Sequence, residues 1–394
     1  MSVRRLGVLL THPVQYYSAL FRELAQRDGV DLEVLYAHQP TAAEQGADFG
    51  VEFSWDVDLT SGYAHRFLEN RARRNRGGGF AGYDTPEVAG LIRSGRYDAF
   101  VVLGWHARTY WQAMRACWSA SVPVFVRGDS QLGGADEGAR GLAKKLTYPL
   151  FVRRFAACLA TGTRSEAYFR HYGARSVVRS PHFVDNEWFA TRAAAVGSAA
   201  ARATFGLPGE ELVILFAGKL VDRKRPVDVI EAAIRAQRPV SVLIAGDGAL
   251  RGECEAAAVR ARAVGVTVSF AGFLNQSAIP AAYAAADVIA LPSNDRESWG
   301  LVVNEAMACG KPAIVSAQVG CGPDLVLEGR TGFVHPHGDV DALAAAIRRL
   351  ADDRVLTREL GEAARSRVSR YSASAAADGV LQAVNAHPRA VRAQ

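Results

Sequence analysis

Residues 287–310 read DVIALPSNDRESWGLVVNEAMACG, and this stretch indicates the fold more clearly than any other part of the chain. An apolar strand over 287–291 leads into a polar loop, and Ser298 is expected to cap a helix over 300–308. A helix that starts at the carboxyl edge of a parallel sheet presents free backbone N–H groups to a ligand. Its dipole favours an anion, and Gly300 allows close approach to the backbone. The stretch therefore predicts an anion site at a strand-to-helix turn.

Apolar runs of strand length alternate with helix-like stretches along the whole chain. The runs are continuous, which is typical of parallel strands that are covered on both faces. Two consecutive series of such runs predict an α/β fold with two doubly wound, Rossmann-like domains facing across a cleft. The strand-like runs are 6–10, 32–36, 99–103, 122–126 and 157–160 in the first series, and 212–217, 240–245, 266–270, 288–291 and 313–315 in the second.

The boundary between the two domains is expected in an Ala-, Ser- and Gly-rich stretch that precedes the run at 212–217. Its composition leaves two forms open, a flexible hinge or a short helix on the domain surface. The sequence predicts a first domain over 1–190, a linker over 191–207 and a second domain over 208–371. The remaining 372–394 has the pattern of a helix with a frayed tail, and we expect it to pack back on the first domain.

Length and composition are those of an ordinary globular chain. The 394 residues correspond to about two domains of ~150 residues, and the hydrophobic and charged shares are 49% and 22%. No apolar run approaches the ~20 residues of a transmembrane helix, and the run at 6–10 is shorter than the core of a signal peptide. The five cysteines are scattered, so neither a disulfide framework nor a zinc site is expected. These features predict a cytoplasmic protein.

The excess of positive charge, a net +6, is concentrated in one segment. Between residues 138 and 175 eight basic residues accompany a single acid, Glu166. Peripheral contact with an anionic membrane, at its inner face, is one interpretation, and a solvated protein face is the other. No recognition helix or RNA-binding motif accompanies the charge, so nucleic acid is not an expected partner. The eight residues are Arg140, Lys144, Lys145, Arg153, Arg154, Arg164, Arg170 and Arg175.

Two carboxylates flank the predicted anion site. Glu297 precedes the predicted helix and Glu305 follows eight residues later, a separation of roughly 12 Å along a helix. That distance is too long for an acid/base pair on one bond, so the two side chains fit the two ends of one extended ligand. A nucleotide-sugar, with a hydroxyl-bearing ring on each side of its diphosphate, has this layout. The alternative is that Glu297 is an exposed loop acid and Glu305 a surface helix residue.

A second strand end carries a cluster of cations. The run at 212–217 ends in Gly218, and four cations follow within seven residues. Such side chains neutralise a diphosphate and compensate the negative charge that develops on a leaving phosphate. Cations are disfavoured at the start of a helix, and this conflict with local preference indicates a functional role. The four cations are Lys219, Arg223, Lys224 and Arg225.

These motifs together resemble those of the retaining glycosyltransferases of family 4, which have the GT-B fold. The resemblance covers nearly all of 212–350 and is carried most specifically by the E-x7-E element from Glu297 to Glu305. An HPVQY loop at 12–16 is similar to one in a bacterial polysaccharide-related branch of that family. The other matching motifs are FAGK at 216–219 with Arg223-Lys224 after it, IAGDG at 244–248, FAGF at 270–273, GCGPD at 320–324 and TGF at 331–333.

The resemblance implies a donor site in the second domain. Lys219 and Lys224 would hold the donor diphosphate, and the backbone around Phe273 would meet the base. Glu297 would contact the donor sugar at the reacting centre, and Glu305 would hold the ribose hydroxyls. Lysine at 219 departs from the commoner arginine, which keeps the charge but loses the bidentate fork. The expected donor set is Gly218, Lys219, Arg223, Lys224, Phe273, Glu297, Trp299, Gly300, Leu301, Val302 and Glu305.

The first domain is expected to hold the acceptor. Its HPVQY loop replaces the Gly-Gly loop that family members usually have, and it places His12, Gln15 and Tyr16 at the carboxyl edge of the first strand. A proline-fixed turn whose tyrosines pack in the core is the alternative. His106 stands where the family carries a cleft histidine near the reacting centre, and a core histidine is the alternative there. Asp129 follows the next strand and is assigned to the acceptor side.

The predicted reaction is transfer of a sugar from a nucleotide-diphosphate sugar to an acceptor hydroxyl, with His106 and Glu297 as candidate catalytic residues. The resemblance implies retention of configuration along a same-face path, in which the departing phosphate takes the acceptor's proton. No metal and no cofactor beyond the donor are expected. The acceptor would be a saccharide, a lipid-linked saccharide or a small molecule, in cell-surface polysaccharide or glycolipid assembly. A nucleotide-sugar 2-epimerase of the same architecture and a non-catalytic sugar-nucleotide-binding protein are the two alternatives.

Overall fold

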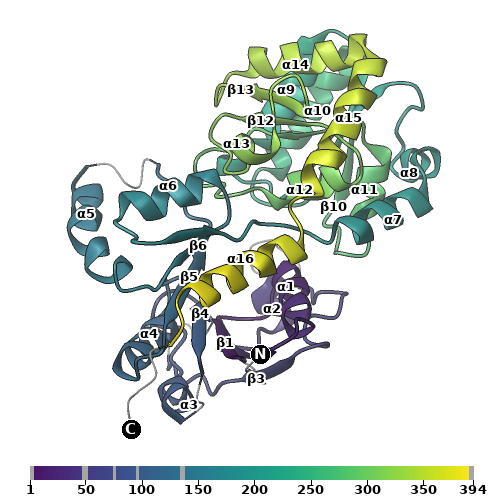
Figure 1. The fold of residues 1–394 in the computed structure, drawn as a ribbon. Helices are drawn as coiled ribbons and strands as arrows, with labels where there is room; N and C mark the ends of the chain where they lie inside the picture. The colour runs from purple at the N-terminus through teal and green to yellow at the C-terminus, as the bar shows by residue number, and fades with distance from the viewer. Residues whose placement is uncertain (1–3, 47–51, 74–76, 95–96, 134–137, 390–394) are drawn as a thin grey trace. The chain divides into compact units, whose positions relative to one another are not determined.

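The chain forms two compact units (Figure 1). Unit 1 is built from residues 1–44, 58–182 and 373–394, and unit 2 from residues 45–57 and 183–372. The chain therefore leaves unit 1 twice and returns to it twice. The structure is a computed structural model, and the residues that it describes are 4–46, 52–73, 77–94, 97–133 and 138–389.

Unit 1 is a doubly wound parallel sheet of seven strands in the order β3-β2-β1-β4-β5-β6-β7. All four residues of β4 are buried, which shows that both faces of the sheet are covered. The strand order reverses between β1 and β4, where sheets of this kind bind ligands. The strands are β1 (Arg4–Leu10), β2 (Val30–Tyr36), β3 (Ala64–Phe67), β4 (Ala99–Val102), β5 (Val124–Gly128), β6 (Cys158–Ala160) and β7 (Val177–Arg179). The helices are α1 (Gln15–Ala25), α3 (Glu87–Ser94), α4 (Arg108–Ser119), α5 (Gly138–Val152), α6 (Thr163–His171) and α16 (Ala373–Ala386), and α2 (Ala42–Gly46) spans the change to unit 2.

Unit 2 repeats this architecture with six parallel strands in the order β10-β9-β8-β11-β12-β13. The predicted fold class, two doubly wound Rossmann-like domains, is therefore confirmed. The strands are β8 (Leu212–Ala217), β9 (Val240–Ala245), β10 (Thr267–Gly272), β11 (Val288–Leu291), β12 (Ala313–Ser316) and β13 (Gly332–His335). The helices are α7 (Asn186–Val196), α8 (Ser198–Thr204), the 3-10 turn η2 (Asp222–Lys224), α9 (Pro226–Ala236), α10 (Arg251–Ala263), α11 (Ile279–Ala285), α12 (Leu301–Ala308), α13 (Gly322–Leu325), α14 (Val340–Asp352) and α15 (Arg354–Val368).

Three strands do not coincide with a predicted apolar run: β3, β7 and β13. Each lies at the edge of its sheet. An edge strand has one neighbour, and several of its side chains face solvent, as in β3, where three of the four residues are exposed. These three strands lack the continuous apolar pattern that identifies the central strands, whereas β10 (Thr267–Gly272), which also lies at an edge, overlaps the predicted run at 266–270.

The expected linker at 191–207 is not a hinge between the units. The chain passes from unit 1 to unit 2 between His182 and Phe183, and α7 and α8 then occupy most of the expected linker. Both helices pack on α11, where Phe189 lies 6.0 Å from Tyr283. The alanines of this stretch are explained by packing, because a small side chain such as that of Ala201, which is fully buried, lets helices approach closely.

Two segments belong to a different unit from the residues that adjoin them in sequence. The last helix, α16, is part of unit 1, where it packs against α1 and β7. A Cβ on Gly379 would lie 1.9 Å from the backbone oxygen of Arg179, so the helix and the strand touch through their backbones. Residues 45–57, which fall within the predicted first domain, are part of unit 2. None of the helices in the described ranges is both long and apolar enough to span a membrane.

Candidate functional site

The turn before α12 keeps its first amides free of a capping side chain. The N-cap of α12 is Gly300, at φ 98° and ψ 62°, and no side chain caps this end of the helix. The prediction that Ser298 caps the helix is wrong, because Gly300 adopts the left-handed conformation and takes that position. A Cβ at Gly300 would also lie 2.7 Å from Cδ2 of Leu291 in β11. Backbone N–H groups of such a turn, together with the helix dipole, suit an anion.

Backbone contacts with the loop before α13 hold this turn in place. The N–H of Gly320 donates to the carbonyl of Glu297 at 2.9 Å, and the N–H of Cys321 donates to that of Trp299 at 2.9 Å. A Cβ at position 320 would lie only 1.8 Å from the carbonyl oxygen of Ser298. Glycine at 320 is therefore required for the turn to approach, which gives part of the GCGPD motif a structural reason.

Three of the predicted donor residues have side chains that lie in or against the hydrophobic core. The indole of Trp299 is buried, and its Nε1 donates to Oδ1 of Asn304 at 2.8 Å. Leu301 and Val302 pack against the hydrophobic core with half-buried side chains. The indole of Trp299 is thus a core group, and the main-chain N–H groups of Leu301 and Val302 are the parts that face the uncapped end of α12.

The cations after β8 gather at Glu297. Nζ of Lys224 lies 2.6 Å from Oε2 of Glu297, and Nη1 of Arg223 lies 3.4 Å from the same oxygen. The Lys224 and Glu297 side chains are only 11% and 13% exposed. Lys219 is half-buried just after the strand, whereas Arg225 begins α9 and pairs with Asp228. The structure therefore brings Lys224, a predicted diphosphate ligand, and its neighbour Arg223 to Glu297, the predicted sugar ligand.

Glycines let the ends of β8 and β9 touch through their backbones. Gly218 has φ 145°, and a Cβ there would lie 3.2 Å from Cδ of Lys224, so the lysine chain lies across it. Gly246 has φ 143°, and its Cβ would lie 1.9 Å from the carbonyl oxygen of Gly218. The GK and AGDG motifs therefore shape one platform beside Lys224.

Glu305 lies in α12, five residues after Gly300, and its side chain contacts Tyr283 of α11. Its Oε2 accepts a hydrogen bond of 2.5 Å from the hydroxyl of Tyr283, which is fully buried. Burial raises the pKa of Glu305 to about 7, and the bond from Tyr283 offsets part of that rise. The carboxyl group is therefore close to half-protonated at neutral pH. Tyr283 is a site residue that sequence reasoning missed.

Phe273, the predicted base-side residue, follows β10 and meets the returning segment of unit 2. Its ring lies 4.5 Å from that of Phe53, which in turn lies 5.1 Å from Trp55. The side-chain amide of Asn275 donates to the carbonyl of Ser54 at 2.9 Å. Phe53 is a second missed residue, because nothing in its own stretch of sequence indicates a partner more than two hundred residues away.

Unit 1 gathers its predicted residues at the carboxyl edge of its own sheet. His12 follows β1, and its Nδ1 lies 3.1 Å from Oγ1 of Thr11. Burial lowers the pKa of His12, and His38 and His106 lower it further. The ring of His106, after β4, lies 5.4 Å from that of Tyr110, and burial lowers its pKa while Asp129 opposes the shift. Both imidazoles are therefore neutral at neutral pH and able to accept a hydrogen bond.

A second group at this edge is formed by Tyr16, Asp129 and His182. The Tyr16 ring lies edge-on at 5.5 Å from the ring of His182, whose Nε2 is 3.5 Å from Oδ2 of Asp129. Burial lowers the pKa of His182, and Asp129 acts against this. Gln15 begins α1, and its Oε1 is buried without a hydrogen-bond partner among the residues described. His182 was missed because its neighbours Phe183 to Asp185 resemble a structural turn.

Arg127 supports this group from the core of unit 1. The side chain is almost fully buried at the end of β5. Its Nε donates to Oγ of Ser180 and its Nη2 to the carbonyl of Pro181, at 3.1 and 2.9 Å. The guanidinium also lies over the ring of Tyr17, 5.3 Å from its centroid. Arg127 therefore fixes the chain that leads directly into His182.

Within the described ranges, no three His, Cys, Asp or Glu side chains lie together in a way that could hold a metal ion. The predicted acceptor residues His12, Gln15, Tyr16 and Asp129 share one sheet edge with His106. The predicted donor residues share the corresponding edge of unit 2.

Comparison with known proteins finds similarity that is concentrated in the second unit. Residues 198–367 match the family model "Glycosyl transferases group 1". A D-inositol 3-phosphate glycosyltransferase of Streptomyces avermitilis is 35% identical over 211 residues, which cover 50% of this chain and 45% of that protein. The sulfoquinovosyl transferase SQD2 of Arabidopsis thaliana is 32% identical over 178 residues, covering 44% of this chain and 33% of that protein. The chain thus spans about half the length, or less, of the curated relatives that it matches.

Solved structures resemble nearly the whole chain. Anabaena Alr3699/HepE in complex with UDP has a TM-score of 0.73 at 19% identity and covers 97% of this chain and 100% of its own. Sucrose-phosphate synthase from Thermosynechococcus elongatus has a TM-score of 0.69 at 21% identity and covers 97% of this chain and 98% of its own. These structures show that the fold is GT-B.

Proposed function

We propose that the protein is a glycosyltransferase that moves a sugar from a nucleotide-diphosphate sugar to an acceptor hydroxyl, with retention of configuration. One observation carries the proposal: the uncapped turn at Gly300 lies next to Glu297, which is paired with Lys224 and Arg223. Amides at the turn after β11 and cations at the end of the adjacent strand β8 form a receptor for a diphosphate. The family match over 198–367 supports the same function, and the related HepE fold binds UDP.

In this proposal the diphosphate takes over the contacts that Glu297 now makes. Phosphate oxygens replace the carboxylate at Lys224 and Arg223, and Glu297 then accepts a hydrogen bond from a donor-sugar hydroxyl. Lys219 adds charge at the end of β8. As the bond between the anomeric carbon and the phosphate oxygen breaks, these cations and the α12 amides stabilise the charge on the leaving group. Glu305 accepts from the ribose hydroxyls with the oxygen that Tyr283 does not use.

The acceptor is assigned to the edge of unit 1 formed by His12, Gln15, Tyr16 and Asp129. The neutral ring of His106 accepts a hydrogen bond from the sugar or the acceptor and holds it in position. The acceptor oxygen forms the new bond to the anomeric carbon on the same face, and its proton passes to the departing phosphate. This path needs no nucleophile from the protein, and we propose that it needs no metal and no cofactor besides the donor.

The acceptor class is proposed to be a saccharide or lipid-linked saccharide in cell-surface polysaccharide or glycolipid assembly, on the cytoplasmic side of the membrane. Relatives are named for an inositol phosphate acceptor and for sulfoquinovosyl transfer, so a phosphorylated small molecule is a second acceptor worth testing.

Two measurements test the function. A thermal-shift screen with UDP, GDP, ADP, TDP and CDP identifies the base, because a ligand raises the melting temperature more the more tightly it binds the folded state. Turnover of the matching nucleotide-sugars is then followed by NMR, with an acceptor panel, with and without excess EDTA. We expect a retained glycosidic product that forms in EDTA. An epimer formed from donor alone would indicate the 2-epimerase instead, and nucleotide binding without turnover would indicate a binding protein.

A further inference from the structure

Helix α5 of unit 1 exposes a stripe of leucines. Leu142, Leu146 and Leu150 are 60%, 68% and 74% exposed, and their spacing of four residues places them on one side of the helix. One exposed leucine is ordinary for a soluble protein, but three in a row on one helix form an apolar surface that water solvates poorly.

Cations flank this stripe, and acids are missing from it. Lys145 is exposed and follows Leu142 by three residues, which places it beside the stripe. Arg153 and Arg154 are exposed just beyond the end of α5. No Asp or Glu occurs anywhere in the sequence from 138 to 165. A helix with exposed leucines and flanking cations has the composition of one that lies in a membrane interface.

Helix α4 continues this surface with two tryptophans. A pocket of about 480 Å³ is lined from α4 by Trp111, Arg115 and Trp118, and from the α5 side by Leu150 and Arg154. The guanidinium of Arg154 lies 3.9 Å from the centre of the Trp118 ring. Tryptophans and arginines at the edge of an apolar stripe suit the headgroup layer, where one end of each side chain is apolar and the other polar.

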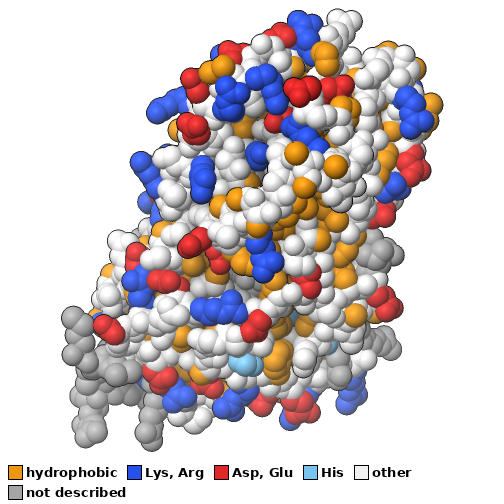
Figure 2. Space-filling model, turned by 90° about the vertical axis from the view of Figure 1, so that its right-hand side faces the viewer, with side chains coloured by type: hydrophobic (Ala, Val, Ile, Leu, Met, Phe, Trp, Pro, Cys, Tyr) orange, Lys and Arg blue, Asp and Glu red, His pale blue; other side chains and the backbone are white. Residues whose placement is uncertain are grey.

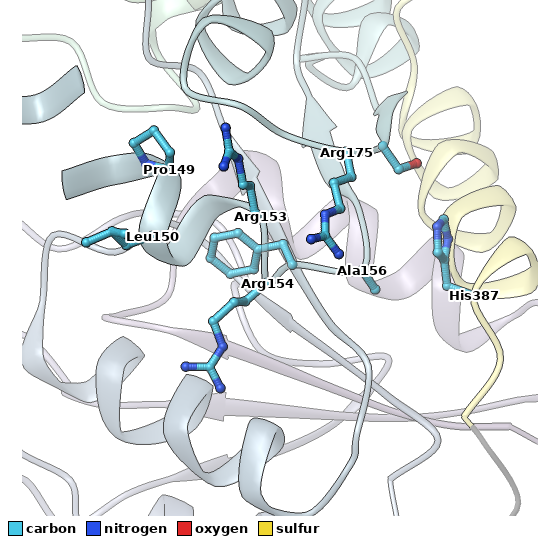
Figure 3. A pocket seen from close by; sticks show the side chains of 9 residues that line it. Pro149, Leu150, Arg153, Arg154, Ala156, Arg175 and His387 are labelled. Atoms are coloured by element: carbon cyan, nitrogen blue, oxygen red, sulfur yellow. The ribbon is translucent and has the colours of Figure 1, made fainter. Parts of the chain in front are cut away.

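An adjoining pocket collects three arginines. It measures about 810 Å³ and is lined by Arg153, Arg154 and Arg175 together with Leu150 and His387 (Figure 3). These arginines have no ion-pair partner among the described residues, whereas the neighbouring Arg170 and Arg179 both pair with Glu166. A guanidinium without a carboxylate partner is well suited to bind phosphate. By contrast, Figure 2 shows Lys and Arg interspersed with Asp and Glu over another face of the molecule.

We propose that unit 1 binds a lipid bilayer that contains anionic phospholipids, through a membrane-binding surface of ten residues on and beside α4 and α5. The leucines enter the interface, the tryptophans lie at the headgroups, and the arginines bind lipid phosphates. Nucleic acid would use the arginines but would leave the leucine stripe exposed to water. The ten residues are Trp111, Arg115, Trp118, Leu142, Lys145, Leu146, Leu150, Arg153, Arg154 and Arg175.

This surface shares no residue with the proposed donor or acceptor sets, so it can be tested whether or not the proposed function holds. The full chain is sedimented with vesicles of phosphatidylcholine alone and of phosphatidylcholine mixed with phosphatidylglycerol, at low and high salt. We expect binding to the mixed vesicles that weakens as salt rises, because exposed charges are screened.

Two variants separate the apolar contribution to vesicle binding from the ionic contribution. Arg153→Ala/Arg154→Ala/Arg175→Ala is expected to weaken binding to mixed vesicles about a hundredfold, since each arginine near an anionic surface contributes roughly a fivefold factor. Leu142→Ser/Leu146→Ser/Leu150→Ser is expected to weaken binding at least tenfold at both salt concentrations. Both variants are expected to keep the melting temperature, because the substituted leucines are exposed.

The matched controls lie on α15 of unit 2, where Val355 is 55% exposed and Arg358 is exposed. Val355→Ser and Arg358→Ala should bind vesicles like the unchanged protein. Absence of vesicle binding, equal binding by all variants, or binding to single-stranded RNA in place of vesicles that survives the leucine substitutions would overturn the proposal.

Discussion

The ion pair between Lys224 and Glu297 explains how a buried lysine is stable at the end of β8 when no ligand is bound. Both side chains are largely removed from water, and each would be costly there alone. Their mutual contact of 2.6 Å offsets that cost. A diphosphate carries more negative charge than one carboxylate and can therefore displace Glu297 from Lys224. The ion pair thus stabilises the folded protein when no ligand is bound, and Lys224 binds the diphosphate when the ligand is present.

Lys224→Ala is therefore expected to affect both activity and stability. Transfer should fall at least tenfold, which corresponds to about 1.4 kcal/mol of lost transition-state stabilisation. The free energy of unfolding should fall by about 3 kcal/mol, because Glu297 is left with a poorly compensated charge. Steady-state kinetics and urea unfolding measure the two effects.

The double variant Lys224→Ala/Glu297→Gln separates the effect on activity from the effect on stability. It should recover much of the stability and none of the activity, because the buried charge is gone but the diphosphate contact is still missing. Arg358→Ala, on the exposed side of α15, is the control. Full activity of Lys224→Ala on its native donor would rule out the site assignment.

Glu305 makes stability depend on pH. Burial raises its pKa to about 7 in the folded chain from 4.5, so between these two pH values the folded state holds a proton that the unfolded state has released. Stability contributed in this way is present below pH ~4.5 and is lost as pH rises to ~7. Glu305→Gln should therefore flatten the pH dependence of the unfolding free energy by about 3 kcal/mol in that window.

Donor binding should show the opposite trend, because the ionised carboxylate is the better acceptor for ribose hydroxyls. We expect the donor KM to fall as pH rises through ~7, and Glu305→Ala to lower transfer at least tenfold at pH 8. Urea unfolding and donor KM, each measured from pH 5 to 8, check the two trends. A donor KM that does not change with pH would contradict this role of Glu305.

Single residues could be predicted from sequence where their chemistry conflicts with local preference. Four cations before a helix are such a conflict, and they indicated Lys224. Glu297 and Gly300 were indicated instead by their place between an apolar strand and a helix. Tyr283 and Phe53 carry no such signal. A tyrosine in an alanine-rich helix is compatible with any core, and its contact with Glu305 arises only when α11 and α12 pack together.

At the scale of elements, the site lies on strands that the sequence identifies well. The ends of β8, β9 and β11 bear Gly218, Gly246 and the turn before α12, and all three strands are interior and buried throughout. The edge strands β3, β7 and β13, which were not predicted, hold none of the predicted donor or acceptor residues. Site and fold were predictable for the same reason, since central parallel strands are buried on both faces and their ends form the ligand edge.

The loop before α13 offers a test of how strictly the α12 turn must be placed. Gly320→Ala puts a Cβ within 1.8 Å of the Ser298 carbonyl oxygen, so the turn from Glu297 to Gly300 must shift. Transfer should fall about tenfold or more although residue 320 is assigned no ligand contact, because small displacements of aligned groups cost much of the rate. Kinetics with saturating acceptor measure the effect.

Gly252→Ala is the matched control for this variant. Gly252 lies in α10 with no atom within 4 Å of a new Cβ, so alanine should leave activity unchanged and stabilise the helix by up to ~1 kcal/mol. If Gly320→Ala kept normal transfer, the turn would not be the diphosphate receptor.

For the whole molecule, tertiary packing decides which stretch belongs to which unit. Periodicity and composition give two units, but an alanine-rich stretch is equally compatible with a linker and with the buried face of α7 and α8. The return of α16 to unit 1 and of residues 45–57 to unit 2 depends on contacts between segments far apart in sequence. Residues 53–57 bring Phe53 to Phe273, the predicted base-side residue.

Phe53 is expected to extend the apolar wall on which the donor base rests. Its ring lies 4.5 Å from that of Phe273, and only 9% of the residue is exposed. Phe53→Ala should raise the donor KM about fivefold, the equivalent of ~1 kcal/mol for one aromatic pair, and leave kcat nearly unchanged. The exposed Phe80 of unit 1 provides the control Phe80→Ala, which should change neither constant. A lower KM in Phe53→Ala would mean instead that the ring blocks the base, and an unchanged KM would mean that the base binds elsewhere.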